Sequence, residues 1–207
     1  MIAIVDYGMG NVRSLENAFA YFGHDVCITA NENELAQAER IVLPGVGAFG
    51  DAMLAIRERN LDKILTHQAM VVRKPILGIC LGMQLFAKRS GEHGEHEGLG
   101  WIDADIERLQ VPRPLKVPHV GWNELHFSSD DWLFKGIRPA EGNFYFVHSF
   151  HMVCRNAANV IATTDYGGPV TAVVRSDNLV AAQFHPEKSQ DNGLKMLENW
   201  VTWSPSC

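Results

Sequence analysis

The sequence predicts an α/β protein: a mostly parallel central sheet flanked by helices, with antiparallel strands appended to it. Two patterns along the chain support this fold class. In the first half, short apolar runs typical of buried strands alternate with stretches of helical periodicity, separated by glycine-bearing turns. In the second half, short β-prone runs follow one another with turns between them, which is typical of antiparallel pairs.

The bulk composition limits the classes of protein to consider. The chain has 207 residues, of which 46% are hydrophobic and 20% are charged, enough for one sizeable core. No linker, repeat or low-complexity tract divides it, so we expect residues 1–207 to form a single domain. A net charge of −6 without a long basic run argues against a nucleic-acid surface. The first residues do not resemble a signal peptide, and no apolar run is long enough to span a bilayer.

The cysteines indicate a reducing environment. Cys27, Cys80, Cys154 and Cys207 lie far apart, and no two of them form a C-x-x-C pair. A disulfide framework or a structural zinc site is therefore not expected. A reduced, cytoplasmic protein fits best.

The chain opens with an α/β unit. Ile2–Val5 is a strand-like apolar run, Asp6–Asn11 is a turn with two glycines, and the helix that follows ends at Gly23. The apolar face of this helix consists of Val12, Leu15, Phe19 and Phe22. The G-x-G of the turn lacks the third glycine of a dinucleotide-binding fingerprint, so a tight turn is the better interpretation.

A glycine-rich loop follows the third expected strand. Val26–Thr29 and Arg40–Leu43 are strand-like, with a short helix around Glu34–Ala38 between them. The loop Pro44–Gly50 then lies at the carboxyl end of a strand, where open α/β sheets bind ligands. Its small residues leave backbone N–H groups accessible, as an oxyanion hole requires. Taken alone, however, an ordinary flexible loop explains the stretch better.

The strand Pro75–Ile79 leads to Cys80, after which a helix opens. The G-x-C-x-G spacing is that of a nucleophile elbow, and Gly78 and Gly82 are the small neighbours that a strained turn needs. The N-terminal end of a helix favours a thiolate. A buried structural cysteine is the alternative, and this stretch alone does not decide between them. The helix before the strand has one apolar stripe: Leu61, Ile64, Leu65, Ala69 and Val72.

The helix after Cys80 is expected to continue through Ala87. Gln84, four residues after Cys80, shares its helix face and can look toward the same pocket. Residues 90–98 are polar and glycine-rich, with His93 and His96 among three glutamates. No flanking periodicity fixes these side chains, so we interpret the stretch as a solvated surface loop and expect no metal site.

The last strand ends in a second candidate group, His185 with Glu187. In an extended segment these positions point the same way, and Pro186 restrains the histidine. A surface histidine and glutamate are the alternative, but with Cys80 the pair supplies the base and orienting carboxylate that a thiol nucleophile needs. The expected strands of this half are Lys116–Trp122, Glu124–Phe127, Asn143–Val147 (continuing to Met152), Val160–Thr164, Val170–Arg175 and Leu179–Phe184; Leu194, Leu197 and Val201 face the core from a final helix.

The motifs G-I-C-L-G-M-Q and F-H-P-E together resemble those of the class I (triad) glutamine amidotransferases. The stretches D-Y-G-M-G-N, P-G-V-G-A-F-G, P-H-V-G-W-N, Y-F-V-H-S-F and F-H-P-E-K-S resemble one branch of that family, the glutaminase subunits of imidazole glycerol phosphate synthase in histidine biosynthesis. The resemblance covers essentially the whole chain and implies a flavodoxin-like three-layer sandwich.

The resemblance also implies roles for individual residues. Cys80 would attack the side-chain amide of L-glutamine, with His185 as acid and base and Glu187 orienting the imidazole. The backbone N–H groups of Leu81 and Val46 would form the oxyanion hole. Five further residues would hold the glutamine: Gly47, Gln84, Glu92, Ser149 and Phe150, of which Gly47, Ser149 and Phe150 would act through main-chain groups.

The resemblance further implies a partner and no cofactor. Ammonia would pass to a separate cyclase subunit with a (β/α)8 barrel, in a heterodimer, to make imidazole glycerol phosphate and an aminoimidazole carboxamide ribotide. Candidate interface segments are Asp6–Asn11, His119–Asn123 and Lys188.

Three alternatives are open: a glutaminase subunit of another pathway, a cysteine peptidase or hydrolase, and a binding module without catalysis. Relatives in other pathways lack the D-Y-G-M-G-N and H-V-G-W-N stretches. A peptidase would place its histidine soon after the elbow, and a degenerate module would be free to lose Cys80, His185 or Glu187.

Overall fold

The computed structural model describes residues 1–138 and 142–204. Its central sheet has eight strands in the order β2-β1-β3-β4-β14-β13-β12-β9. The first five run parallel to their neighbours. They are β2 (Val26–Thr29), β1 (Ile2–Val5), β3 (Arg40–Leu43), β4 (Ile76–Ile79) and β14 (Leu179–Ala182).

Three antiparallel strands extend this sheet beyond β14. They are β13 (Pro169–Ser176), β12 (Val160–Asp165) and β9 (His126–Phe127). The predicted fold class, a mostly parallel sheet with appended antiparallel strands, is therefore confirmed.

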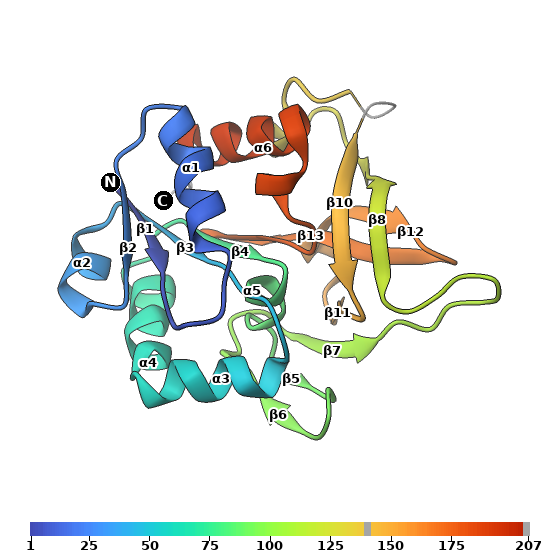
Figure 1. Cartoon of the computed structure of the whole chain (residues 1–207), viewed down its shortest axis with the longest axis horizontal. Coiled ribbons are helices and arrows are strands. Elements are labelled where there is room, and N and C mark those ends of the chain that lie inside the picture. The colour runs from blue at the N-terminus through green and yellow to red at the C-terminus, as the bar shows by residue number, and fades with distance from the viewer. Residues whose placement is uncertain (139–141, 205–207) are drawn as a thin grey trace.

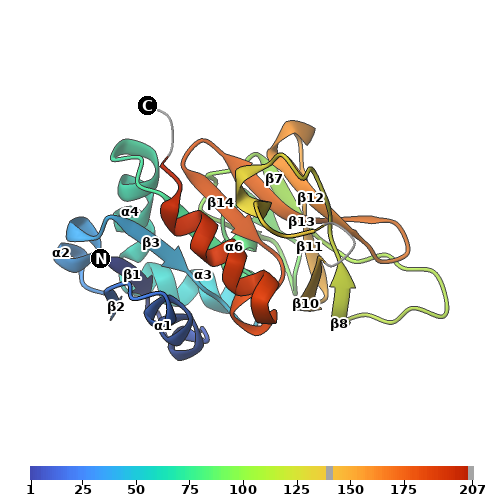
Figure 2. The ribbon, with the colours of Figure 1, turned by 90° about the horizontal axis from the view of Figure 1, so that it is seen from above.

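Helices cover both faces of the sheet (Figure 1). α1 (Val12–Tyr21) and α6 (Gln190–Thr202) lie on one face, and α3 (Phe49–Glu58) and α4 (Leu61–Thr66) lie on the other. Each pair packs into its own cluster of buried side chains, so that the two cores are separated by the sheet. Figure 2 shows α6 lying obliquely over the sheet beside α1. The short α2 (Glu32–Gln37) connects β2 to β3.

Two smaller sheets stand beside the central one. β10 (Asn143–His148) pairs with β8 (His119–Glu124), and both project at the far end of the molecule from α2 (Figures 1 and 2). The other small sheet has the order β11-β7-β5-β6, formed by Phe150–Cys154, Ala104–Arg108, Arg89–Ser90 and His96–Glu97. Short 3-10 turns are η2 (Trp132–Phe134), η4 (Ala157–Asn159) and η5 (Pro186–Lys188).

The helix after Cys80 is shorter than the sequence predicts. α5 covers only Leu81–Gln84. The N–H groups of Phe86 and Ala87 donate three residues back, to Met83 and Gln84, instead of four. This tightened turn ends the α-helix, and a later segment, residues 99–102, then satisfies the carbonyls of residues 85–87.

The stripe from Leu61 to Val72 is also only partly as predicted. Leu61, Leu65 and Ala69 are fully buried, but Val72 is 47% exposed. After α4 the chain widens into the π-helical segment η1 (His67–Val71), and the Val72 N–H donates to His67, five residues back. The wider turn rotates Val72 out of the stripe.

Several strands also differ from the prediction; for example, β14 ends at Ala182 instead of Phe184, and β8 begins at His119 instead of Lys116. β7 is a strand that the prediction omits, and β8 runs through Glu124 instead of ending at Trp122. The chain also turns at Ser149, so that β10 and β11 enter different sheets. No helix in the two described ranges has the length and apolar character that a bilayer crossing requires.

Candidate active site

Cys80 occupies a strained turn between β4 and α5. Its backbone has φ 54° and ψ −110°, a region that residues with a side chain rarely adopt. Gly78 and Gly82 make the turn possible, because a Cβ on Gly82 would lie 1.8 Å from the Leu43 carbonyl oxygen and one on Gly78 would lie 2.9 Å from the Gly82 oxygen. Both glycines therefore serve close packing, as the elbow pattern requires.

Two polar groups lie close to the sulfur of Cys80. Its Sγ lies 3.9 Å from the Val147 carbonyl oxygen, which accepts from the thiol. The side-chain amide of Gln183 lies 3.8 Å away and donates to the sulfur. Cys80 is only 7% exposed, so these few contacts govern its sulfur.

His185 and Glu187 meet beside Cys80, at the end of β14. Nδ1 of His185 lies 2.9 Å from Oε1 of Glu187, and both side chains are almost completely buried. The two residues come together through the 3-10 turn η5 rather than through a plain extended segment. Nε2 of His185 is buried and makes no other hydrogen bond, so it is the ring atom left to interact with the Cys80 sulfur.

Burial alone would lower the pKa of His185, but Cys80 and Glu187 outweigh it. Hydrogen bonding and charge interactions with these two residues raise the pKa to about 9. The imidazole is therefore held in its charged form near neutral pH, with a carboxylate on one side and the sulfur on the other.

A cavity of about 380 Å³ opens over the sulfur. Nine of the ten residues singled out from the sequence line it, while Glu187 lies behind His185. The lining consists of Val46, Gly47, Cys80, Leu81, Gln84, Glu92, Pro118, Val147, His148, Ser149, Phe150, His185 and Lys188.

The expected oxyanion hole is not open in this structure. The N–H of Leu81 donates to the Gly45 carbonyl at 3.3 Å, so this donor is already occupied. The Gly45 carbonyl and the Val46 N–H belong to one peptide unit and point in opposite directions. Rotation of that single unit would release Leu81 and turn the Val46 N–H to the same side.

The loop that holds this peptide is anchored from behind. The buried Tyr7 hydroxyl donates to the Pro44 carbonyl at 2.9 Å. Burial, and secondarily the nearby Cys80, raises the pKa of Tyr7, so it remains a donor. A Cβ on Gly45 would lie 2.6 Å from the Tyr7 oxygen, which shows how closely the loop packs.

Gln84 and Glu92 enter the cavity with part of their hydrogen-bonding capacity used. The amide nitrogen of Gln84 donates to the Phe150 carbonyl at 3.0 Å and to Oε1 of Gln183 at 3.1 Å, which leaves its own Oε1 for a ligand. Oε2 of Glu92 accepts from the N–H of Phe49, the first residue of α3, at 2.7 Å. Glu92 thus satisfies an N–H group at the N-terminus of α3, and its other carboxylate oxygen is left for a ligand.

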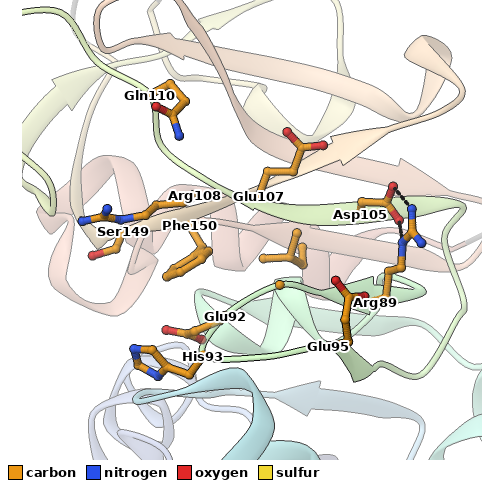
Figure 3. A pocket seen from close by; sticks show the side chains of 12 residues that line it. Arg89, Glu92, His93, Glu95, Asp105, Glu107, Arg108, Gln110, Ser149 and Phe150 are labelled. Atoms are coloured by element: carbon orange, nitrogen blue, oxygen red, sulfur yellow. Dashed lines mark hydrogen bonds and ion pairs between the residues drawn. The ribbon is translucent and has the colours of Figure 1, made fainter.

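A second cavity, of about 870 Å³, adjoins the first (Figure 3). Glu92, Ser149 and Phe150 line both cavities, so the second continues the first toward the surface. Its wall carries both charge signs. Asp105 is neutralised there by Arg89 and Arg155, and the hydrogen bond from Arg89 is the main cause that lowers its pKa.

The polar stretch 90–98 is more ordered than a solvated loop. It forms the β5–β6 hairpin, and the ring of His96 packs against Gly50 at the start of α3. Among residues 1–138 and 142–204, no group of three or more His, Cys, Asp or Glu side chains is arranged to hold a metal ion. Cys27, Cys80 and Cys154 are free thiols, and Cys207 lies outside the described residues.

Sequence reasoning missed two residues that shape the site, Gln183 and His148. Gln183 contacts both Cys80 and Gln84, and His148 lines the cavity. Gln183 directly follows the apolar strand β14 and precedes Phe184, and a buried polar residue in this apolar stretch was the available signal. His148 had no comparable signal, because its neighbours come from a strand that is distant in sequence.

This arrangement of sheet, elbow and buried histidine defines a class of protein. A family model described as glutamine amidotransferase class-I matches residues 3–203. The chain therefore belongs to the class-I glutamine amidotransferases, which are enzymes.

Curated relatives identify the group within that family. The chain is 48% identical over 209 residues to imidazole glycerol phosphate synthase subunit HisH 2 of Nitrobacter winogradskyi, with 99% of each chain covered. It is 47% identical over 206 residues to subunit HisH of Sulfurimonas denitrificans, with 98% of each covered. The chain belongs with these HisH glutaminase subunits.

Solved structures agree on the fold. PurLQS from Thermotoga maritima superposes with a TM-score of 0.73 at 21% identity, over 97% of this chain and 96% of that one. A structure described as a glutamine amidotransferase gives a TM-score of 0.71 at 21% identity, over 98% and 100% of the two chains. At such identities the likeness shows the shared fold alone.

Proposed function

We propose that this chain hydrolyses L-glutamine to glutamate and ammonia through a thioester on Cys80. The observation that carries the proposal is the pair of Cys80, on a strained turn, and the buried His185, which line one cavity while Glu187 holds the imidazole from behind. A thiolate and an imidazolium held together in this way are a nucleophile and its proton donor.

In the first half of the reaction, the Cys80 thiolate attacks the side-chain carbonyl carbon of glutamine. The carbonyl oxygen becomes an oxyanion, which the N–H groups of Leu81 and Val46 receive after the Gly45–Val46 peptide has turned. Nε2 of His185 then gives its proton to the amide nitrogen. The C–N bond breaks, and ammonia leaves a γ-glutamyl thioester.

In the second half, His185 acts as a base. Its neutral Nε2 takes a proton from water, which attacks the thioester carbon, and the C–S bond breaks to release glutamate. Glu187 keeps Nδ1 protonated throughout, so that Nε2 is the atom that exchanges the proton.

The amino-acid end of glutamine would lie where the two cavities join. Glu92 and the Oε1 atom of Gln84 are acceptors suited to its α-ammonium group, and Gly47, Ser149 and Phe150 offer main-chain groups. The carbonyls of Ser149 and Phe150 already accept hydrogen bonds from Leu109 and Gln84, so these two residues would contribute their N–H groups.

The ammonia would serve a separate cyclase subunit, as the names of the relatives as synthase subunits suggest. We propose that this subunit is a (β/α)8 barrel in a heterodimer with the present chain, and that it makes imidazole glycerol phosphate for histidine biosynthesis. Among the interface candidates, His119–Asn123 has the clearest support, because Val120 and Trp122 are 55% and 48% exposed on one face of β8. Asp6–Asn11 and Lys188 are the other candidates.

We also propose that the chain works as one domain in the cytoplasm, where its described free thiols would stay reduced.

The test is Cys80→Ala, assayed in the complex with the cyclase subunit. We expect glutamine hydrolysis to be abolished while synthesis from added ammonium salt continues, because the ammonia acceptor lies on the other subunit. Loss of both activities would overturn this division of labour. Retained glutaminase activity would show that Cys80 is not the nucleophile.

A further inference from the structure

A series of hydrogen bonds connects Asn123 and His119 of β8 with the candidate active site. Nδ2 of Asn123 lies 3.3 Å from Nε2 of His119. Nδ1 of His119 lies 3.1 Å from Nε2 of His148, and Nδ1 of His148 lies 2.9 Å from the Phe150 carbonyl oxygen. His119 and His148 are both buried, and neither takes part in the proposed reaction.

The position of the proton on each imidazole ring follows from the last acceptor of this series, the Phe150 carbonyl. A carbonyl oxygen only accepts, so Nδ1 of His148 must donate to Phe150. In a neutral ring Nε2 of His148 is then the acceptor, which makes Nδ1 of His119 the donor. Nε2 of His119 in turn accepts from the amide of Asn123. The donors thus all point one way, toward the Phe150 carbonyl.

Both rings are neutral at ordinary pH. Burial lowers the pKa of His119 to about 4. Burial, with the nearby charges of other histidines, lowers the pKa of His148 to about 3 although the Phe150 hydrogen bond raises it. The stacked rings of Phe146 and Tyr166 enclose His119, with centroids 4.8 and 3.9 Å away.

The Phe150 carbonyl oxygen also accepts a hydrogen bond from the Gln84 side chain, so this one oxygen connects two residues that line the cavity on different elements. The Leu109 N–H donates to the Ser149 carbonyl, so these two residues form a hydrogen-bonded pair. Hydrogen-bonded and non-hydrogen-bonded pairs alternate along an antiparallel ladder, so the next pair, Arg108 and Phe150, is not hydrogen-bonded. Hence β7 does not hold the polar groups of Phe150. The side chains of His148 and Gln84 hold its carbonyl instead.

We propose that His148 is a positioning residue, held as the Nδ1–H tautomer by His119, which fixes the Phe150 peptide and with it Gln84. It acts through these two residues and touches no reacting atom. The proposal rests on the proposed function, since Phe150 and Gln84 are assigned to glutamine binding. Its consequence is that His148 sets affinity for glutamine rather than the rate of bond breaking.

The tautomer can be tested without any activity. In the protein labelled with 15N-histidine, the NMR spectrum of the ring nitrogens at pH 7 should show His148 and His119 as neutral Nδ1–H tautomers. The signals of each ring are assigned by their loss in His148→Asn and His119→Asn. Either ring as an imidazolium or an Nε2–H tautomer would overturn the proposal. This result is independent of what the protein catalyses.

The binding role is tested by calorimetry with glutamine, in the complex with the cyclase subunit and on a Cys80→Ala background. His148→Asn keeps a donor near the Nδ1 position, whereas His148→Gln carries its amide nearer Nε2 and His148→Leu has no donor. We expect His148→Gln and His148→Leu to weaken the Kd by about tenfold, and His148→Asn to stay within about threefold. With Cys80 intact, the same variants should raise KM by a similar factor with little change in kcat.

The matched control is His151→Asn, which alters a half-buried histidine of the same region that lines neither cavity. A Kd unchanged in His148→Gln, or raised equally in His148→Asn, would overturn the proposal. Absence of glutamine binding to the Cys80→Ala complex itself would instead refute the proposed function, and the tautomer result would stand apart from it.

Discussion

The backbone of Cys80 is held in an energetically unfavourable conformation. A backbone with φ 54° and ψ −110° is unfavourable for any residue with a Cβ, by about 1–3 kcal/mol. The surrounding structure imposes this turn, since Gly78 and Gly82 let β3, β4 and α5 approach closely on both sides of it. In this conformation Cys80 lines the cavity while it remains packed against the core.

This strain predicts an inverted order of stability between two variants. Glycine normally destabilises a fold relative to alanine because it is more flexible when unfolded. At position 80 the relief of strain should be larger, so Cys80→Gly should be more stable than Cys80→Ala by about 1 kcal/mol in urea denaturation. The control is Cys154, in strand β11, where the alanine variant should be the more stable. The same order at both positions would contradict strain at the elbow.

His185 predicts how activity depends on alkaline pH. With its pKa raised to about 9, the ring stays protonated, and so able to protonate leaving ammonia, up to that pH. The rate constant kcat/KM for glutamine should therefore fall above about pH 9. Since the folded-state pKa exceeds the ordinary value of 6.5, the stabilisation from this proton is complete below pH 6.5 and is lost as the pH rises through 9.

Glu187→Gln tests the cause of that shift. The substitution removes a negative neighbour, so the pKa of His185 should fall and the alkaline limb should move to lower pH. An unchanged limb in this variant would mean that a group other than His185 is being titrated.

At the scale of elements, the site depends on how closely the carboxyl ends of β3 and β4 approach α5. Gly82 is the contact point, because an added methyl group would lie 1.8 Å from the Leu43 carbonyl oxygen. Backbone on both sides leaves no side chain to move aside.

We therefore expect Gly82→Ala to destabilise the protein by at least about 3 kcal/mol, measured by denaturation, and to lower glutaminase activity even in the folded fraction. Gly91→Ala is the control, since a Cβ there meets nothing within 4 Å. Normal stability of Gly82→Ala would show that the elbow is packed less tightly than the distance to the Leu43 carbonyl oxygen indicates.

The elements also show where sequence patterns succeed. Strands such as β1, β4 and β14 consist of continuous apolar residues, and their buried parallel pairing follows from local composition. The helix after Cys80 was overestimated because the carbonyls beyond its end are satisfied by donors from Leu99, Gly100 and Ile102, which no local pattern contains. The break between β10 and β11 was missed for the same reason: each strand's partner lies elsewhere in the chain.

At the scale of the whole molecule, the same limit applies to the site. Cys80, His185 and Glu187 stand in motifs at strand ends, so the chemistry could be predicted from the sequence. The contacts of Gln183 with Cys80 and of His148 with His119 depend on three-dimensional register, and only the structure brings them together. Gln183 leaves only the signal of a polar residue in an apolar stretch, and His148 leaves none, because the partners of both come from distant segments.

The oxyanion loop also bears on how the whole molecule works, because the loop is closed in this structure. The Leu81 N–H is bound to the Gly45 carbonyl, so an oxyanion would lack this donor and also the Val46 N–H that faces away. Loss of one such donor typically costs a factor of about 10²–10³ in kcat. We therefore expect the isolated chain to hydrolyse glutamine slowly, and the proposed cyclase subunit with its substrate bound to raise kcat by at least about a hundredfold.

The measurement compares glutamine hydrolysis by the chain alone, with the cyclase subunit, and with that subunit and its ligand. Hydrogen exchange at the Leu81 amide under the same three conditions gives a second reading, because release from Gly45 should alter its protection in step with kcat. Full activity of the isolated chain would refute the closed loop as the resting state. Activation without any change at Leu81 would move the control to another step, because the Gly45–Val46 peptide cannot form the hole while its oxygen still occupies the Leu81 donor.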